Sequence, residues 1–264
     1  KKITPRLLYL IFVLLPFVSV NALNDRILVG YWHNFKNGAA NGLKLSEVSD
    51  AWDVINLSFA EPTTSTSGIL VYNPTADNIY SSAKEFKADV EAAQKKGKKI
   101  VLSIGGEKGQ VRLETTEARD NFIRTTKEII KEYNLDGLDI DFEGQSLKFE
   151  DGDTDLENPT TPVIKNLIYA LKAICQEFGD DFLLTFAPET YFVQQAYNFY
   201  GGACSGCGAY LPVLYAMKDR LSWLQVQYYN SGSMNSPEGL HACGTEDFVV
   251  YLVKMLADGF PIYG

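Results

Sequence analysis

The chain has 264 residues, of which 24 are Lys or Arg and 33 are Asp or Glu, so its formal net charge is −9. Proteins that bind nucleic acid or anionic lipid need clustered basic side chains, and an acidic chain repels phosphate groups. We therefore expect no nucleic-acid partner and an uncharged substrate. The length suits one large α/β domain.

The first 22 residues have the pattern of a secretory signal peptide. Two lysines precede an apolar run from Leu7 to Val20, and small residues follow up to Ala22. The run is shorter than the ~20 residues that span a bilayer, which favours cleavage over a membrane anchor. Cleavage would remove three basic and no acidic residues, taking the net charge from −9 to −12. We expect a secreted, monomeric chain of residues 23–264 with no membrane attachment.

Short apolar and β-branched runs predict six strands, at 27–32, 54–60, 100–105, 137–143, 183–189 and 224–230. Helical periodicity predicts four helices, at 78–96, 116–133, 162–178 and 246–257. Thr161 and Pro162 supply a start signal for the third helix. Strands and helices that alternate in this way indicate parallel strands with helices packed outside.

Two architectures fit this alternation, an open doubly wound sheet and a (β/α)8 TIM barrel. An open nucleotide-binding sheet usually has a glycine-rich turn after an early strand, and Ser103-Ile104-Gly105-Gly106 lacks the full fingerprint. Polar residues gather instead where the strands end, which is where barrel enzymes place their chemistry. The sequence therefore predicts an α/β barrel. Because only six strands are indicated, we expect its last two strands to be missing from this chain.

The four cysteines predict at least one disulfide. Exported proteins meet oxidising conditions, under which Cys175, Cys204, Cys207 and Cys243 allow three full pairings. A loop closed between Cys204 and Cys207 is favoured. A zinc site that adds His241 is the weaker alternative, because no second paired ligand motif is present. We expect no metal and no cofactor.

The strongest functional signal is the run DGLDIDFE at residues 136–143. Alternate side chains of a strand share a face, so Asp139, Asp141 and Glu143 lie about 6.6 Å apart along one side. Three carboxyl groups this close cannot all ionise, and a carboxyl that keeps its proton near neutral pH suits acid catalysis of glycosidic cleavage. Glu143, at the open end of the strand, is the predicted acid. Asp136 has the other parity and is expected to be structural.

Four motifs together resemble a known family. The octad matches the Asp-x-x-Asp-x-Asp-x-Glu signature of family 18 chitinases and related endo-N-acetylglucosaminidases, and residues 103–106 match the family's Ser-x-Gly-Gly. Residues 227–230, Gln-Tyr-Tyr-Asn, look like its Gln-x-Tyr-Asn segment, and Ala-Pro-Glu at 187–189 lies at the comparable strand end. All four lie at the ends of predicted strands, in the family's order. The chain therefore resembles glycoside hydrolase family 18 from Ile27 to Gly264.

The resemblance implies a retaining hydrolase that uses no enzyme nucleophile. Glu143 would protonate the glycosidic oxygen while the substrate's own 2-acetamido carbonyl attacks the anomeric carbon. Asp141 would accept a hydrogen bond from the acetamido N–H, and Asp139 would hold the proton of Asp141 in the resting state. Tyr229 would donate its hydroxyl to the acetamido oxygen. We choose it over Tyr228 because it shares a strand face with Gln227.

The implied substrate is chitin or N-acetylglucosamine oligosaccharides. Aromatic rings pack against sugar faces, and polar groups at strand ends orient the sugar. The candidate substrate contacts are Tyr31, Trp32, Phe59, Gly105, Gly106, Ala187, Glu189, Gln227 and Asn230.

Two functional alternatives stay open. An endo-β-N-acetylglucosaminidase acting on N-glycans would share the octad, and a non-catalytic chitin-binding lectin would share the fold, although the intact Glu143 argues against the lectin. For the octad itself, a metal site is less favoured because the sequence does not show ligands converging from several elements. A solvated edge strand is less favoured because the alternate residues of the octad are apolar. Residues 151–155, DGDTD, resemble a calcium loop, but Leu156 and Pro162 occupy positions that need glycine and a bidentate acid. We interpret this run as a solvated acidic loop.

Overall fold

The computed structural model describes residues 23, 26–37 and 42–263, and the predicted signal peptide lies outside them. The strands are β1 (Val29–His33), β2 (Val54–Pro62), β3 (Leu70–Val71), β4 (Lys99–Gly105), β5 (Gly137–Asp141), β6 (Leu183–Phe186), β7 (Trp223–Leu224), β8 (Met234–Ser236) and β9 (Gly239–His241). The α-helices are α1 (Ala83–Lys95), α2 (Thr116–Tyr133), α3 (Pro162–Phe178), α4 (Leu211–Met217) and α5 (Glu246–Asp258). Within the described ranges, no helix combines the length and apolar character that crossing a membrane requires.

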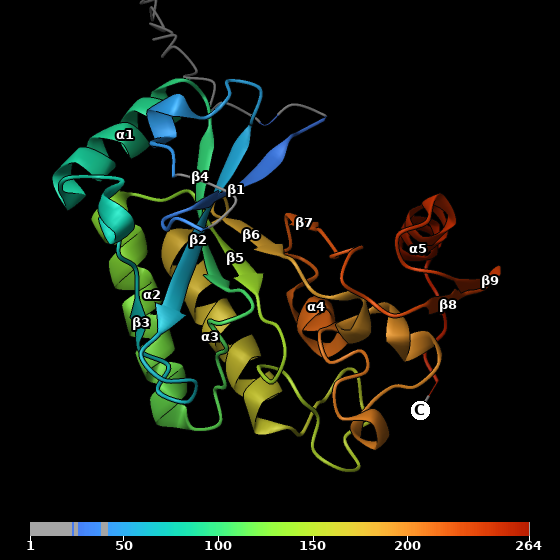
Figure 1. Cartoon of the computed structure of the whole chain (residues 1–264). Helices are drawn as coiled ribbons and strands as arrows, with labels where there is room; N and C mark the ends of the chain where they lie inside the picture. The colour runs from blue at the N-terminus through green and yellow to red at the C-terminus, as the bar shows by residue number, and fades with distance from the viewer. Residues whose placement is uncertain (1–22, 24–25, 38–41, 264) are drawn as a thin grey trace, which may run out of the picture.

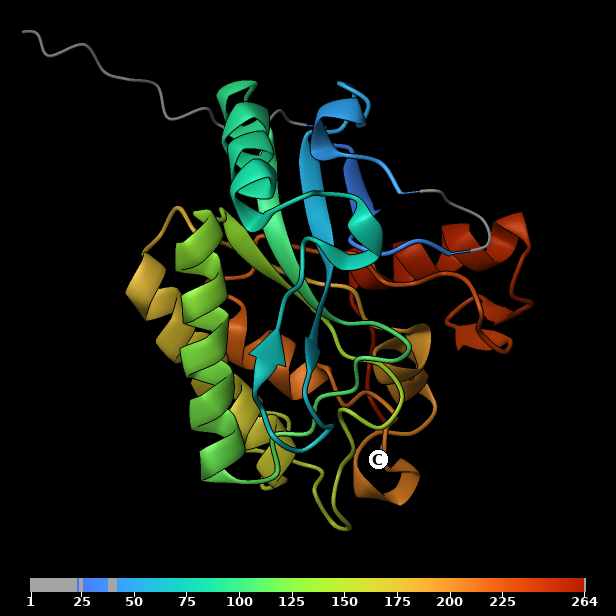
Figure 2. The ribbon, with the colours of Figure 1, turned by 60° about the vertical axis from the view of Figure 1, so that its left-hand side comes forward.

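Six strands form one parallel sheet in the order β1-β2-β4-β5-β6-β7. The sheet curls into part of a (β/α)8 barrel, and helices α1, α2 and α3 stand on its outer side (Figure 1, Figure 2). The predicted architecture is thus confirmed. No strand in the described part of the chain pairs β7 with β1. A side-chain contact joins these two ends of the sheet instead, since Gln225 Nε2 donates to the Tyr31 hydroxyl at 2.7 Å.

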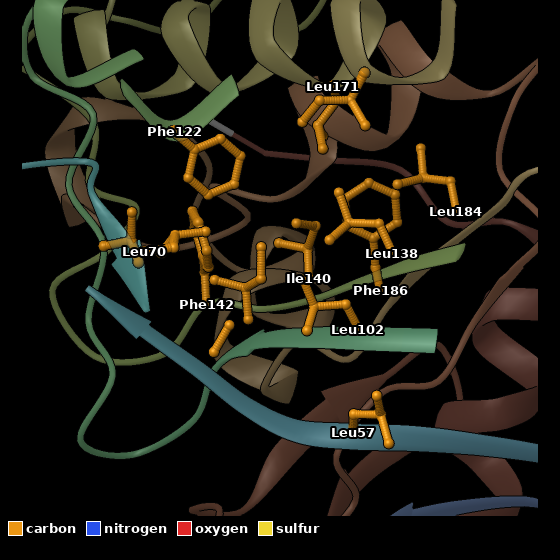
Figure 3. Close-up of a cluster of buried hydrophobic side chains, with 14 of the residues drawn as sticks. Leu57, Leu70, Leu102, Phe122, Leu138, Ile140, Phe142, Leu171, Leu184 and Phe186 are labelled. Carbon is orange, nitrogen blue, oxygen red and sulfur yellow. The ribbon is translucent and has the colours of Figure 1, made fainter. Parts of the chain in front are cut away.

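The hydrophobic core lies between the sheet and its outer helices. Leu102, Leu138 and Ile140 alternate with the polar residues of β4 and β5 and point together toward Phe122 of α2 and Leu171 of α3 (Figure 3). All five are fully buried. Burying a side chain of this size stabilises the fold by roughly 1.5 to 3 kcal/mol. This packing fixes which face of each strand is left for the barrel interior.

Helix boundaries follow from capping residues. Ser82, Thr115 and Thr245 each accept a hydrogen bond from the backbone three residues on, which satisfies an amide that the first helical turn leaves free. The first helix begins at residue 83 rather than at the predicted residue 78, because Asp77 and Asn78 adopt left-handed φ angles of 52° and 56°. The predicted bounds of α2 and α3 are confirmed.

The sequence did not predict helix α4, strand β3 or the hairpin of β8 and β9. Helix α4 is a seven-residue apolar segment, LPVLYAM, that shows no polar face by which to recognise it. The two-residue strand β3 pairs with the end of β2, and the hairpin β8–β9 packs with α5 beyond β7 (Figure 1). Met234, Phe248, Leu252 and Met255 give this last region a small core of its own.

Strand β4 ends at Gly105, where its backbone passes very close to β5. Gly105 has a φ of +123°, and a Cβ atom there would stand 2.0 Å from the carbonyl oxygen of Asp141. The next amide, of Gly106, donates to that same oxygen at 2.9 Å. Glycine is therefore required for both its backbone angle and its small size, and the contact holds the end of β5 in place.

We expect Gly105→Ala to lower the free energy of unfolding by roughly 2 to 4 kcal/mol, since it adds a steric clash to an unfavourable φ. Gly152→Ala is a matched control, because Gly152 has a φ of +82° with nothing within 4 Å of its Cβ position. The control should lose only about 1 kcal/mol in urea unfolding experiments. Equal losses in the two variants would contradict the proposed close contact.

Candidate active site

Asp139 and Asp141 project from β5 into the barrel interior, opposite the apolar residues that face the helices. Asp139 is fully buried and Asp141 is 4% exposed, so both carboxyl groups are largely withdrawn from water. The backbone ladder of β5 ends at Asp141, two residues before the predicted end. Beyond this point the buried hydroxyl of Tyr210 hydrogen-bonds the backbone in place of a neighbouring strand. It accepts from the Phe142 amide at 2.7 Å and donates to the Phe142 carbonyl at 2.9 Å. Glu143 therefore emerges from a fixed strand end.

Three neighbouring strands supply hydroxyl groups to Asp139. Thr185 of β6 donates at 2.6 Å, Ser103 of β4 at 2.8 Å and Tyr31 of β1 at 3.0 Å. The strand register places Ser103 and Thr185 on either side of Asp139. Burial raises the pKa of Asp139, and these hydroxyl donors oppose the rise by stabilising the charged form.

Asp141 is largely buried and lies between two other carboxyl groups, and both features favour its protonated form. Burial, followed by the charges of Asp139 and Glu143, raises the pKa of Asp141 to about 9. Burial also raises the pKa of Glu143, and the charges of Glu189 and Glu107 add to the rise. The cluster therefore holds at least one proton at neutral pH.

One amide joins the two outer carboxyl groups. Gln227 Nε2 donates to Asp141 Oδ1 at 2.8 Å, to Glu143 Oε1 at 2.9 Å and to the carbonyl of Ala187 at 2.9 Å. An isolated parallel bridge between Glu189 and Gln227 extends the pairing of β6 and β7 beyond their named ends. The Glu189 carboxylate accepts a hydrogen bond at 3.4 Å from the backbone amide of Gly144, the residue that follows Glu143.

These groups line a cleft of about 510 Å³, a usual size for a small-molecule site. We call it the acidic cleft. Its lining includes ten residues predicted from the sequence, which are Tyr31, Phe59, Gly106, Asp141, Glu143, Ala187, Glu189, Gln227, Tyr229 and Asn230. Asp139 lies behind them. Tyr229 is 60% exposed, and its neighbour Tyr228 turns away to pack against Phe248, as its parity predicted.

One predicted substrate contact is wrong, and another residue acts differently from expectation. Trp32 is 4% exposed, its ring stacks on Phe86, and its Nε1 donates to the carbonyl of Leu43, so it belongs to the helix-facing core. It follows Tyr31 in β1, and adjacent residues of a strand face opposite sides. Gly105 does not line the cleft and instead permits the approach of β4 to β5.

Several residues of the site were not predicted. His33, Glu107 and Gln225 line the acidic cleft, while Thr185 and Tyr210 hold its carboxyl groups and backbone. Strand parity places Gln225 on the face of Gln227, although Gln225 was not among the predicted substrate contacts. Asp136 was predicted to be structural, and its carboxylate accepts from the amide of Ile100 and from Gln94 at the start of β5.

Local contacts show how the cysteines and the acidic loop at residues 151–155 are arranged. Cys204 and Cys207 form a disulfide, whereas Cys175 and Cys243 are free. Across the described ranges, no group of three or more His, Cys, Asp or Glu side chains is arranged to hold a metal ion. The acidic loop is not wholly solvated, because Asp153 is buried and accepts from the amide and hydroxyl of Thr161.

Comparisons with known proteins agree with this geometry. The family described as "Glycosyl hydrolases family 18" matches residues 27–243, so the chain belongs to that family. It is 50% identical over 248 residues to "Exochitinase 1" of Streptomyces olivaceoviridis, covering 90% of this chain and 41% of the relative. It is 50% identical over 226 residues to "Probable class II chitinase" of Arthroderma benhamiae, covering 83% and 68%.

A solved structure supports the fold as well as the family. A family GH18 chitinase from Chromobacterium violaceum superposes with a TM-score of 0.78 at 39% identity, over 90% of this chain and 60% of that one. The chain thus spans 41% of the first relative's length and 60% of the solved structure's.

The raised pKa of Asp141 makes a prediction about stability. Its unfolded-state pKa is near 3.8 and its folded-state pKa is about 9, so the unfolded chain loses this proton first and stability falls as pH rises between them. Asp141→Asn removes that penalty. We expect it to stabilise the protein by roughly 2 to 4 kcal/mol at pH 8, with the gain shrinking toward pH 4.

Urea unfolding of the variant and the parent at both pH values measures this difference. Asp151→Asn, on the exposed part of the 151–155 loop, is the control and should change stability little at either pH. An Asp141→Asn variant that is less stable than the parent at pH 8 would show that Asp141 is ionised there without penalty.

Proposed function

We propose that this protein is a chitinase that hydrolyses β-1,4-linked N-acetylglucosamine polymers with retention of configuration. The observation that carries the proposal is the row of three carboxyl groups, Asp139, Asp141 and Glu143, that rises from the buried interior to the lining of the acidic cleft. The raised pKa of Glu143 favours the protonated form that an acid catalyst needs. The relatives named above as chitinases support this substrate over N-glycans.

The first half of the reaction breaks the glycosidic bond. Glu143 gives its proton to the glycosidic oxygen as the bond between that oxygen and the anomeric carbon breaks. The acetamido carbonyl oxygen of the same sugar attacks the anomeric carbon and forms an oxazolinium ring. Asp141 accepts a hydrogen bond from the acetamido N–H, and its charge develops as its proton is shared with Asp139. Tyr229 donates its hydroxyl to the acetamido oxygen.

The second half restores the enzyme. Glu143, now a carboxylate, takes a proton from a water molecule, whose oxygen attacks the anomeric carbon and opens the oxazolinium ring. Two inversions at one carbon give net retention. Gln227 keeps Asp141 and Glu143 together through its shared amide, which suits a proton that must move during each half of the cycle.

We also propose that residues 1–22 are a cleaved signal peptide and that the protein is secreted and monomeric. The apolar run after two lysines and the disulfide between Cys204 and Cys207 support export. N-terminal sequencing of protein recovered from the culture medium would find Leu23 first. Recovery of the whole chain in the membrane fraction would contradict the proposal.

Glu143→Gln should reduce kcat by roughly 100- to 10,000-fold, because it removes the general acid while keeping the side chain's shape. Hydrolysis of fluorogenic N-acetylglucosamine oligosaccharides measures the loss. Glu157→Gln, an exposed carboxylate outside the acidic cleft, should retain parental activity. A protein that binds chitin while neither parent nor variant cleaves any substrate would support the lectin alternative instead.

The two residues of the β6–β7 bridge should shift the pH dependence in opposite directions. Glu189→Gln removes a negative charge near Glu143 and should move the alkaline limb of kcat/KM to lower pH. Gln227→Met removes a hydrogen-bond donor that lowers the pKa of Glu143 and should move that limb to higher pH. We expect shifts of roughly 0.5 to 1 pH unit between pH 5 and pH 10. Shifts in the same direction would show that protonation of Glu143 does not set this limb.

A further inference from the structure

Gln225 follows β7 directly and links the two open ends of the sheet. Its backbone amide donates to the carbonyl of Phe186 at 2.9 Å, which continues the pairing of β6 and β7. Its side chain lies on the face of Gln227 and reaches β1, where its Nε2 donates to the Tyr31 hydroxyl at 2.7 Å. The reaction steps given above assign no role to this residue.

The hydroxyl groups that donate to Asp139 differ in what holds them in place. Ser103 and Thr185 pair with Asp139 in the register of β4 and β6, so backbone hydrogen bonds position both hydroxyl groups. Tyr31 lacks this support, because β2 and β4 separate β1 from β5 in the sheet. Its hydroxyl reaches Asp139 Oδ2 from a strand that does not pair with β5, at 3.0 Å. The direction of this hydroxyl therefore depends on a side-chain contact.

The Gln225 amide fixes the direction of the Tyr31 hydroxyl. A phenol carries one proton, and an amide nitrogen donates without accepting. Because Gln225 Nε2 donates to the Tyr31 oxygen, the Tyr31 proton is left for Asp139. Burial, with the charges of Asp139 and Asp141, raises the pKa of Tyr31, so the hydroxyl keeps its proton. The three side chains form a chain of donors that point one way, and each bond in such a chain strengthens the next.

This chain of donors favours the charged form of Asp139. Burial raises the pKa of Asp139, and the hydroxyl donors and Gln225 oppose the rise. Burial also raises the pKa of the nearby Tyr210 well above its usual range, so Tyr210 stays neutral. Asp141 is then the neighbour with which Asp139 competes for a proton. A donor that stabilises the charge on Asp139 leaves this proton on Asp141.

We propose that Gln225 is a positioning residue that acts through Tyr31 to keep Asp139 ionised. The inference rests on the proposed chitinase reaction, in which Asp139 shares the proton of Asp141 as charge develops there. It also gives different roles to two glutamines on one face. Gln227 contacts the two outer carboxyl groups directly, whereas Gln225 acts on the inner one.

Carboxyl titration by ¹³C NMR tests this role in Gln225→Met, Tyr31→Phe and the double variant. Each single variant should move the upper titration step of the three-carboxyl row to higher pH by roughly 0.5 to 1 unit, because the charge on Asp139 loses stabilisation. The double variant should shift by less than the sum of the two, since both changes break the same chain. Gln176→Met, which replaces an exposed glutamine of α3, is the control and should titrate like the parent.

Steady-state kinetics on N-acetylglucosamine oligosaccharides gives a second readout. Gln225→Met should lower kcat by roughly 3- to 10-fold, the effect of one lost hydrogen bond. Gln225→Glu should lower kcat further, because its carboxylate would accept the Tyr31 proton in place of Asp139.

A purely structural role for Gln225 predicts a different result. If this side chain only braced the two ends of the sheet, Gln225→Met would lower the free energy of unfolding and leave the titration step where it is in the parent. That result would overturn the inference, and so would shifts that add in full in the double variant. If no substrate is cleaved but the steps move as expected, the positioning role stands and only the proposed activity is contradicted.

Discussion

The burial of carboxyl groups along β5 is the constraint on which the site depends. A fully buried carboxyl such as Asp139 is costly unless hydrogen bonds replace its lost water. Hydroxyl groups from β1, β4 and β6 meet this need, which requires these strands to hold a fixed register around β5. The apolar packing behind the sheet and the close approach at Gly105 maintain that register. Fold and site are therefore specified by the same contacts.

Charge then decides how the row behaves along its length. Asp139, the inner carboxyl group, is surrounded by hydrogen-bond donors. The pKa of Asp141, the middle one, is raised by burial and by the charges of both neighbours. Glu143, the outer one, lines the acidic cleft. Such an arrangement lowers stability at alkaline pH and keeps a proton close to the acidic cleft, a compromise usual at catalytic sites. Gln227 and Glu189, which pair just beyond β7 and β6, act in opposite directions on the pKa of Glu143: the Gln227 hydrogen bond lowers it and the Glu189 charge raises it.

The sequence predicted those parts of the structure that follow from periodicity. Alternation along β5 correctly distinguished its acidic face from its apolar face. The same parity rule correctly placed Tyr229 at the cleft and Tyr228 in the packing behind it. The same rule applied to β1 would have excluded Trp32, which follows the inward-facing Tyr31. Tyr210 could not be predicted, because its contact with Phe142 joins segments whose approach depends on the whole fold.

Carboxyl titration by ¹³C NMR tests the central claim most directly. In protein labelled at Asp and Glu side-chain carbons, one carboxyl of the Asp139–Asp141–Glu143 row should titrate near pH 9, and its signal should be absent from Asp141→Asn protein. Such a result would establish that the row keeps a proton through neutral pH. If all three carboxyl groups titrated below about pH 5, as unperturbed groups do, the account of a shared and buried proton would be wrong.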